Sequence, residues 1–365
     1  MSNPKAIPFA NIPYLRVWDR LPLNSFAISL LLLLTFVAIA LLQDLMLGTD
    51  DRASIGDGDD VTPGQQMLLL SGFLFTYLVG YFLFLWVRGF VGDIQALARE
   101  FGDAVDEEAV LREVTPGRLA VGVEWLAAFL WVMISLTMFA RNIMVANGQP
   151  DDLASVMSEI LQAMVRGELT IWALVFYFVW TFTLLTHLVA FTLRSSHRMM
   201  SLAREIPVSL FRSELLAPLA NPFLRSLLLL VASLVVLPGW LFFSEDSGIG
   251  VDLTVNFVLC VLVSASNFAP LYVVYRRVSE AKAHELECVN EGLKGEMSAM
   301  GESLLGAEGQ QLSYVELVQY KDAVQRVWPW PVGPQIQKII LIGLIPPLSW
   351  VMAAFVEIWL GAAVE

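Results

Sequence analysis

Two ionisable residues stand inside otherwise apolar stretches of this sequence, and they are the first candidates for chemistry. Glu124 lies in the stretch Leu119–Ala140, and His187 lies in the stretch Leu169–Leu193. A carboxylate beside an imidazole can hold or pass a proton. If both stretches are membrane-crossing helices, a rise of about 1.5 Å per residue puts the two side chains within about 3 Å of the same depth. The pair therefore predicts a proton-sensitive contact or the lining of an ion path. The favoured alternative is structural, with Glu124 reaching toward Arg118 and His187 in an ordinary hydrogen bond between helices.

A second group of polar and helix-disturbing residues gathers in three later apolar stretches. Proline lacks a backbone donor and interrupts a helix, and the first of these stretches contains Pro238-Gly239. Transporters often build ion and substrate sites from discontinuous helices, although prolines also simply kink packed helices. The candidate pathway residues are Asn256, Ser264, Ser266, Asn267, Pro270, Pro346, Pro347, Ser349 and Glu357.

Signatures of soluble enzymes are absent from the sequence. There is no glycine-rich phosphate loop, no HExxH motif, no CxxC pair and no GxSxG motif. The three histidines, His187, His197 and His284, have no metal-site spacing, and the two cysteines, Cys260 and Cys288, form no disulfide framework. We therefore expect no catalytic site, no metal and no cofactor.

Seven long apolar stretches must position these residues. The chain has 365 residues, 57% of them hydrophobic. Each stretch has more than 20 residues, and about 20 helical residues cross a hydrocarbon core roughly 30 Å thick. The sequence thus predicts an all-α, polytopic membrane protein with seven transmembrane helices. The stretches are Ser25–Met46, Met67–Val91, Leu119–Ala140, Leu169–Leu193, Phe223–Phe243, Leu253–Val274 and Ile339–Leu360.

Charge gives the orientation of the predicted spans. Of the 22 lysines and arginines, 19 lie in the amino-terminal segment or in the second, fourth and sixth connections. Positive residues stay on the cytoplasmic side, so the amino terminus is expected inside and the carboxyl terminus outside. This orientation argues against rhodopsins and hormone-type receptors, and no lysine stands inside a span to hold retinal. The net charge of −13 argues against nucleic acid as a partner.

The predicted organisation has four parts. Residues 1–24 form an interfacial cytoplasmic segment, and residues 25–275 form a six-helix bundle with an outer surface helix near 151–165. Residues 276–338 form a cytoplasmic helical hairpin that ends in a proline- and tryptophan-rich elbow. Residues 339–365 contain the seventh span and an external carboxyl terminus.

Two amphipathic patterns lie on the predicted cytoplasmic side. Apolar residues at heptad spacing from Leu286 to Leu304 predict one long helix continuous with span six. The segment Gly306–Gln311 is expected to break that helix, and Tyr314–Val327 is expected to return along it, either packed on itself or bound to a partner. A basic amphipathic stretch, Arg198–Leu216, is expected to rest on anionic headgroups.

These features predict a channel or transport protein of a bacterial inner membrane. Its partners would be the lipid bilayer and either further copies of itself or a membrane or cytoplasmic protein, and spans five to seven would line the pathway. The alternative is a membrane sensor or scaffold that presents the cytoplasmic hairpin without moving a solute. A membrane-embedded enzyme is the weakest hypothesis, because no catalytic constellation is present.

Overall fold

The computed structural model describes residues 23–31, 33–34, 63–146, 158, 162, 169–243 and 249–331. Most of these residues are helical and none belongs to a strand, which confirms the all-α class. The predicted seventh span lies outside the described residues. So does nearly all of the predicted surface helix near 151–165, and the first span is described only in part.

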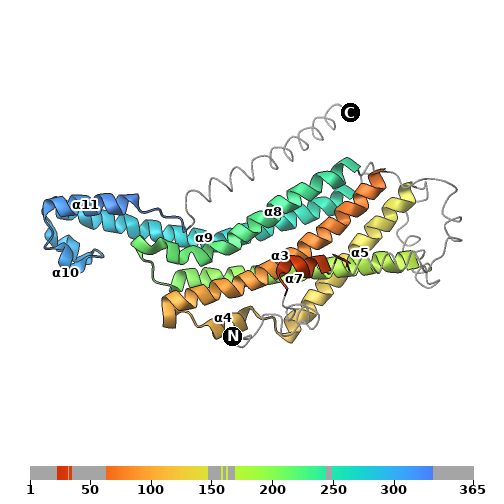
Figure 1. Ribbon diagram of the computed structural model, residues 1–365, viewed down its shortest axis with the longest axis horizontal. Helices are drawn as coiled ribbons and strands as arrows, with labels where there is room; N and C mark the ends of the chain where they lie inside the picture. Colours follow the sequence, from red (N-terminus) through yellow and green to blue (C-terminus); the bar gives the residue numbers. More distant parts are fainter. Residues whose placement is uncertain are drawn as a thin grey trace, which may run out of the picture.

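Five long helices run lengthwise through an elongated bundle (Figure 1). Each contains one of the predicted second to sixth apolar stretches. They are α3 (Pro63–Phe101), α5 (Arg118–Ala146), α7 (Leu169–Glu205), α8 (Ala217–Phe243) and α9 (Ile249–Leu293).

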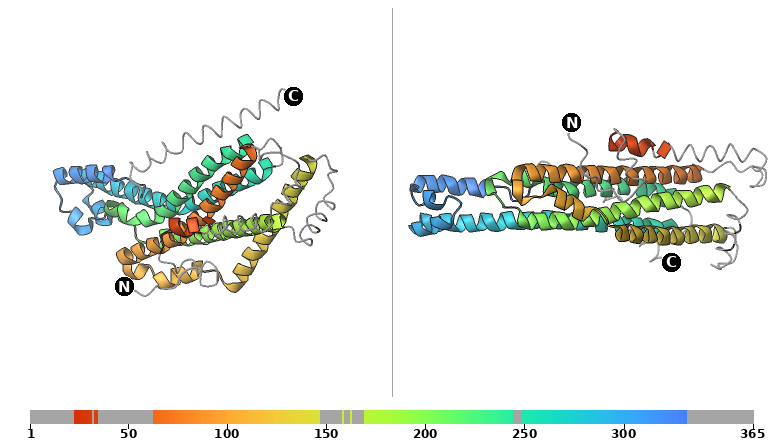
Figure 2. Two further views of the ribbon diagram at one scale, coloured as in Figure 1. Left: turned by 45° about the vertical axis from the view of Figure 1, so that its right-hand side comes forward. Right: turned by 90° about the horizontal axis from the view of Figure 1, so that it is seen from below.

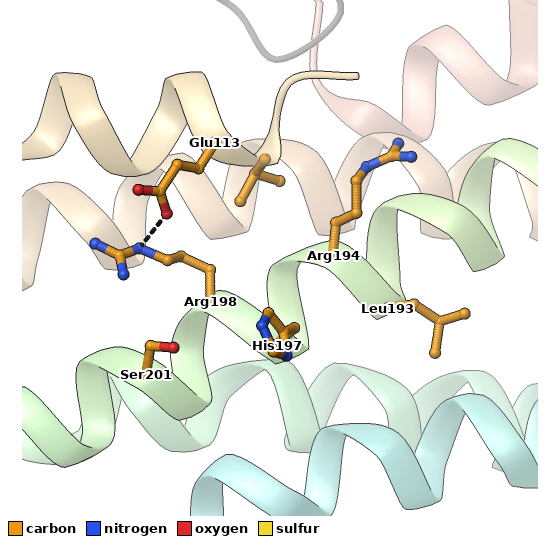
Figure 3. A pocket seen from close by; sticks show the side chains of 7 residues that line it. Glu113, Leu193, Arg194, His197, Arg198 and Ser201 are labelled. Atoms are coloured by element: carbon orange, nitrogen blue, oxygen red, sulfur yellow. Dashed lines mark ion pairs between the residues drawn. The ribbon is translucent and has the colours of Figure 1, made fainter. Parts of the chain in front are cut away.

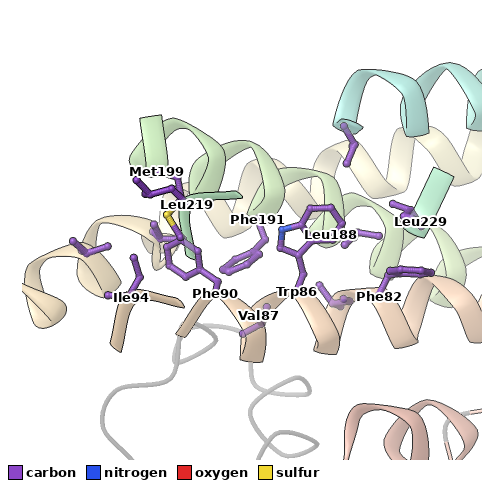
Figure 4. Close-up of a cluster of buried hydrophobic side chains, with 14 of the residues drawn as sticks. Phe82, Trp86, Val87, Phe90, Ile94, Leu188, Phe191, Met199, Leu219 and Leu229 are labelled. Atoms are coloured by element: carbon purple, nitrogen blue, oxygen red, sulfur yellow. The ribbon is translucent and has the colours of Figure 1, made fainter. Parts of the chain in front are cut away.

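Helix α7 lies at the centre of the packing, against α3, α5 and α9, while α8 packs between α3 and α9. Large side chains fill the space between α3 and α7 (Figure 4). Trp86 and Phe90 of α3 and Phe191 of α7 are fully buried. The rings of Phe90 and Phe191 meet edge to face, with centroids 5.7 Å apart. This aromatic and aliphatic packing is the main apolar core of the bundle.

Two segments of the described chain are long and apolar enough to cross a membrane, judged by length and composition. They are Thr76–Phe101 and Glu107–Ser135. The second segment is mostly exposed, with only 17% of its apolar window buried, whereas the core helix of a soluble protein would be largely covered. These two helices support membrane association. The seven spans and the multi-pass topology stay predictions.

Three helices continue well past the predicted span ends (Figure 2). α3, α7 and α9 extend to Phe101, Glu205 and Leu293. The expected surface stretch Arg198–Leu216 is therefore wrong as a separate element, because residues 198–205 belong to α7. Phe211 is 50% exposed, but six of its apolar side chains are buried in the bundle core instead of facing outward: Met199, Leu202, Ala203, Ile206, Leu210 and Leu216.

The short helix α4 (Glu107–Val114) lies beside the extended end of α7. Asp106 caps its amino terminus by accepting a hydrogen bond from the backbone N–H of Ala109. Val110, Leu111 and Val114 are buried against the core. The sequence analysis did not predict this helix.

Helices α8 and α9 stay helical through Pro238 and Pro270. The expected helix breaks at these two prolines are therefore wrong. Proline leaves the carbonyl four residues earlier without its helical donor, which for Pro270 is the carbonyl of Ser266. The hydroxyl of Ser196 on α7 donates to this carbonyl at 2.5 Å. A neighbouring helix thus satisfies the orphaned group.

The hairpin beyond the bundle contains α9's last turns, η4 (Met297–Glu302), α10 (Gly306–Gly309) and α11 (Tyr314–Arg326). α9 is continuous with the predicted sixth span, as expected. It does not continue to Leu304, because it ends at Leu293 and Gly295 turns the chain at a φ of +101°, a conformation that favours glycine.

Helix α11 packs back on α9 through its own small core, which contains Val289, Met300 and Leu317. At the carboxyl-terminal end of α11, Lys282 of α9 donates hydrogen bonds to the carbonyls of Gln325 and Val327. The hairpin is therefore self-packed. The elbow that follows it docks on α9, where the ring of Trp330 stacks on Tyr275 with centroids 4.4 Å apart.

Candidate functional site

The structure brings Glu124 of α5 and His187 of α7 into direct contact. His187 Nδ1 lies 2.5 Å from Glu124 Oε2. The other carboxylate oxygen of Glu124 accepts a hydrogen bond from Nη1 of Arg194, two turns further along α7. Glu124 is 6% exposed and His187 is 2% exposed. The result is a buried network of one carboxylate, one imidazole and one guanidinium.

The surroundings of this network are apolar. The ring of Trp125 meets the ring of His187 edge to face, with centroids 5.9 Å apart. A buried carboxylate is costly unless it is paired and hydrogen-bonded, and here both oxygens of Glu124 have partners. The Glu124 carboxylate thus reaches toward Arg194, rather than toward Arg118. Sequence reasoning missed Arg194 because it directly follows the predicted span and was counted as a cytoplasmic charge.

An open pocket of about 360 Å³ adjoins this network between α4 and α7. Its lining residues come from one face of α7 and from the end of α4 (Figure 3): Glu113, Val114, Leu193, Arg194, His197, Arg198 and Ser201. Arg198 Nε lies 2.9 Å from Glu113 Oε2. Because Arg194 belongs to both, the buried network and the pocket share one cation.

The predicted pathway residues of α9 occupy a different place, in the packed interface with α8 and α7. Ser264 donates to the Ser226 carbonyl of α8 at 3.2 Å. Ser266 and Asn267 both donate to the carbonyl of Val263, each at 2.8 Å. Asn267 is fully buried. These side chains bind helix carbonyls within the protein.

The structure does not describe the side chains of the remaining predicted pathway residues. The backbone of Asn256 belongs to α9, but its side chain lies outside the described part of the structure. Pro346, Pro347, Ser349 and Glu357 also lie outside the described residues.

A second buried ion pair joins α3 to α8. Arg225 Nη1 lies 2.7 Å from Asp93 Oδ2, and Asn221 Nδ2 donates to Asp93 Oδ1 at 2.7 Å. Asp93 is 5% exposed. The sequence analysis did not predict this pair. Counting residues from the predicted span ends could have indicated it. Asp93 lies just past the second span and Arg225 just inside the fifth, so their depths in the membrane differ by only about 6 Å.

No protein-family model, curated protein or solved structure gives a match to this chain. Among the residues that the structure describes, no group of three or more histidine, cysteine, aspartate or glutamate side chains is arranged to hold a metal. The most distinctive chemistry of the described chain is therefore the buried Glu124–His187–Arg194 network with its adjoining pocket.

Proposed function

We propose that the chain is a multi-pass membrane transport protein, with the Glu124–His187–Arg194 network as a proton-sensitive control point near its cytoplasmic side. One observation carries this proposal: an ionisable pair is buried between two long apolar helices. Ionisable groups at membrane depth are rare and usually functional, in proton relays or ion pathways. A carboxylate beside an imidazole can hold or pass a proton.

The packing of helix ends supports the predicted division of the connections between the two sides of the membrane. Asp93 follows the second predicted span, and its partner Arg225 lies just inside the cytoplasmic end of the fifth. Arg277, just after the sixth span, donates to the carbonyls of Ala203 and Ile206 at the end of α7. Connections assigned to the same side of the membrane are thus in contact with one another.

The exposed face of α5 supports a membrane or subunit environment. It presents a continuous apolar surface along the helix: Leu119, Val123, Leu126, Phe129, Leu130 and Ile134 are all more than half exposed. Contiguous apolar surface of this kind marks contact with lipid or with another protein. We propose that α5 faces lipid or a second copy of the chain in a homo-oligomer.

The pathway itself is proposed along α8, α9 and the predicted seventh span, as the sequence suggests. The described pathway candidates of α9 donate to helix carbonyls, so we assign the control of flow to the ionisable pair between α5 and α7. In this scheme, proton binding at His187 changes how tightly α7 holds α5. α7 would pass that change to α9 through the bond between Ser196 and Ser266.

The test is ion flux in liposomes that contain the purified chain, measured across about pH 5–8. Wild-type protein should show flux that changes with pH, and both Glu124→Gln and His187→Gln should flatten that pH profile. Glu280→Gln is the matched control, because Glu280 is 60% exposed and pairs with the exposed Arg276. An absence of flux at every pH and voltage would overturn the transport proposal.

Cysteine labelling tests the membrane topology separately. In a chain with Cys260 and Cys288 replaced by serine, Ser313→Cys on the hairpin should resist a membrane-impermeant maleimide in intact cells. Ser158→Cys, in the predicted outer connection, should react. Equal labelling of both positions would contradict the proposed orientation.

A membrane sensor or scaffold is the second candidate, and the hairpin favours it. Tyr314, Val315 and Val318 on the outer face of α11 are exposed, at 67%, 63% and 43%. A cytoplasmic protein recovered by cross-linking through this face, together with no flux in liposomes, would support this alternative over transport.

A further inference from the structure

The pocket between α4 and α7 concentrates basic side chains on one helix face. His197, Arg198 and Ser201 stand three, four and seven residues after Arg194 along α7, so the four side chains share a face. Glu113 is the only acidic residue in the lining. The volume of about 360 Å³ falls within the usual range of small-molecule sites, about 300–1,000 Å³.

Both arginines have donors to offer a ligand. Arg194 gives Nη1 to Glu124 and its Nε is buried, so Nη2 is the nitrogen that it can offer to a ligand. Arg198 pairs with Glu113, whose side chain is 57% exposed, and its Nη1 also lies 3.7 Å from the 53% exposed Glu205. Exposed ion pairs contribute little to stability. An incoming anion can therefore take the place of Glu113 on Arg198 at small cost.

The pocket begins where the predicted fourth span ends. Leu193 is the last residue of that span and Arg194 is the next, while Ser201 lies about two turns further from the span. Leu193 and Val114 give the pocket an apolar wall. Guanidinium groups beside an apolar wall, at the level where a span leaves the membrane, match the phosphate and upper glycerol of a phospholipid.

The neighbouring surface of α5 suits the acyl chains of such a lipid. α5 starts at Arg118, four residues after Val114. Leu119 and Val123 in its first turns are 84% and 58% exposed. Apolar surface thus continues from the pocket along the predicted span.

We propose that this pocket binds the phosphate group of an anionic phospholipid in the cytoplasmic leaflet. Arg198 and Arg194 donate to the phosphate oxygens, and Glu113 is displaced. Assigning the phosphate to a lipid rests on the proposed membrane placement of the chain, because a soluble phosphate compound would use the same donors. Since Arg194 also holds Glu124, the bound lipid lies one side chain away from the buried network.

The test uses the full chain purified in a neutral detergent. Phosphatidylglycerol and phosphatidylcholine are offered in equal amounts, inorganic phosphate is titrated separately, and the bound ligand is measured by native mass spectrometry. Wild-type protein should retain phosphatidylglycerol in preference. Arg198→Gln should weaken that binding by about tenfold, the usual effect of losing one charge-assisted hydrogen bond. Glu113→Gln should strengthen it, because the competing carboxylate is gone.

Arg112→Gln is the matched control. Arg112 is an exposed arginine on α4 that does not line the pocket, and its loss lowers the net charge by the same amount. Equal weakening in Arg112→Gln and Arg198→Gln would show diffuse attraction and overturn the site. A folding defect cannot imitate the expected result, since Glu113→Gln has to raise the affinity. Unchanged or reduced affinity in Glu113→Gln would also overturn the proposal.

The two phosphate sources and the membrane placement are distinguished by the same experiments. Binding of inorganic phosphate that depends on Arg198, without a preference for phosphatidylglycerol, would overturn the lipid assignment. The membrane proposal fails on a different result, namely the release of wild-type protein from phosphatidylglycerol–phosphatidylcholine vesicles by an alkaline carbonate wash.

Discussion

The hydroxyl of Ser196 on α7 lies 2.5 Å from the carbonyl oxygen of Ser266 on α9. Ser266 stands four residues before Pro270, so its carbonyl has no helical N–H to bind. One side chain on the central helix thus repairs the defect that a proline creates in its neighbour. This contact explains why α9 runs through Pro270 without a break.

Ser196→Ala should destabilise the protein by about 1–3 kcal/mol, because a buried carbonyl loses its donor. The cost should be smaller in a Pro270→Ala background, where the backbone N–H of residue 270 can bind Ser266 instead. A double-mutant cycle on thermal unfolding in detergent measures this coupling. Ser195→Ala is the control, since Ser195 bonds within its own helix to the carbonyl of Thr192. Additive costs of the Ser196 and Pro270 changes would contradict the assignment.

Asp93→Leu should destabilise the bundle by about 3–5 kcal/mol, because it leaves the Arg225 guanidinium largely buried without its anion. The exposed pair of Asp322 and Arg326 provides the comparison. Asp322→Leu should change stability by no more than about 1 kcal/mol. Thermal midpoints of the two variants in the same detergent give the difference, and similar losses would argue against a special role for the buried pair.

Gly89→Ala and Gly92→Ala, three residues apart on α3, should have opposite effects. A Cβ at Gly89 would overlap the guanidinium of Arg225, which would have to move away from Asp93. A Cβ at Gly92 meets nothing within 4 Å. Replacing that helical glycine by alanine should stabilise the protein by about 0.5–1 kcal/mol. Stabilisation by both changes would show that Arg225 does not depend on the space at Gly89.

The hairpin should lose stability at alkaline pH through Tyr320. Burial raises the pKa of Tyr320 above its usual value of 10.0, and its hydroxyl also donates to Glu285 at 2.7 Å. The folded state therefore keeps this proton more tightly than the unfolded state. Its stabilising contribution is complete below about pH 10 and falls as the pH rises further.

Tyr320→Phe should lower the thermal midpoint at neutral pH, by an amount that corresponds to about 1 kcal/mol. The difference from wild type should stay constant up to about pH 10 and shrink as the pH rises above that value. Tyr314→Phe, at an exposed position on the same helix, should show neither effect. A constant difference between wild type and Tyr320→Phe above about pH 10 would contradict the role of the buried hydroxyl.

The sequence predicts the long apolar helices and the amphipathic α11 closely, but it does not predict α4 or the full length of α7. The second to sixth apolar stretches each lie within a helix of the structure. The continuation of α7 beyond Arg194 was missed, because its exposed face is charged and its buried face contains only a few apolar residues. The core that those residues enter is built with α4, and α4 has only eight residues.

The depth of a residue along its helix could be predicted from the sequence. The helices that pack beside it, and the rotation of each helix about its own axis, could not. Counting residues from the predicted span ends placed Glu124 and His187 at one level, and the two side chains do meet. The count gives no rotation about the axis, so it could not show that Arg194 faces the same carboxylate. It also could not show that α3 lies beside α8, which Asp93 and Arg225 require. The expected breaks at Pro238 and Pro270 failed for a similar reason, since the donor that spares Pro270 comes from another helix.

The length of α9 has a mechanical consequence. It is one uninterrupted helix of 45 residues, which corresponds to a rod about 68 Å long. Toward its carboxyl-terminal end, Lys282 donates hydrogen bonds to two carbonyls at the end of α11. Near its middle, the carbonyl of Ser266 accepts a hydrogen bond from α7. A stiff rod held at two points transmits displacement instead of absorbing it. We therefore expect a force on the hairpin to strain the Ser196–Ser266 contact between α9 and α7, the helix that contains His187.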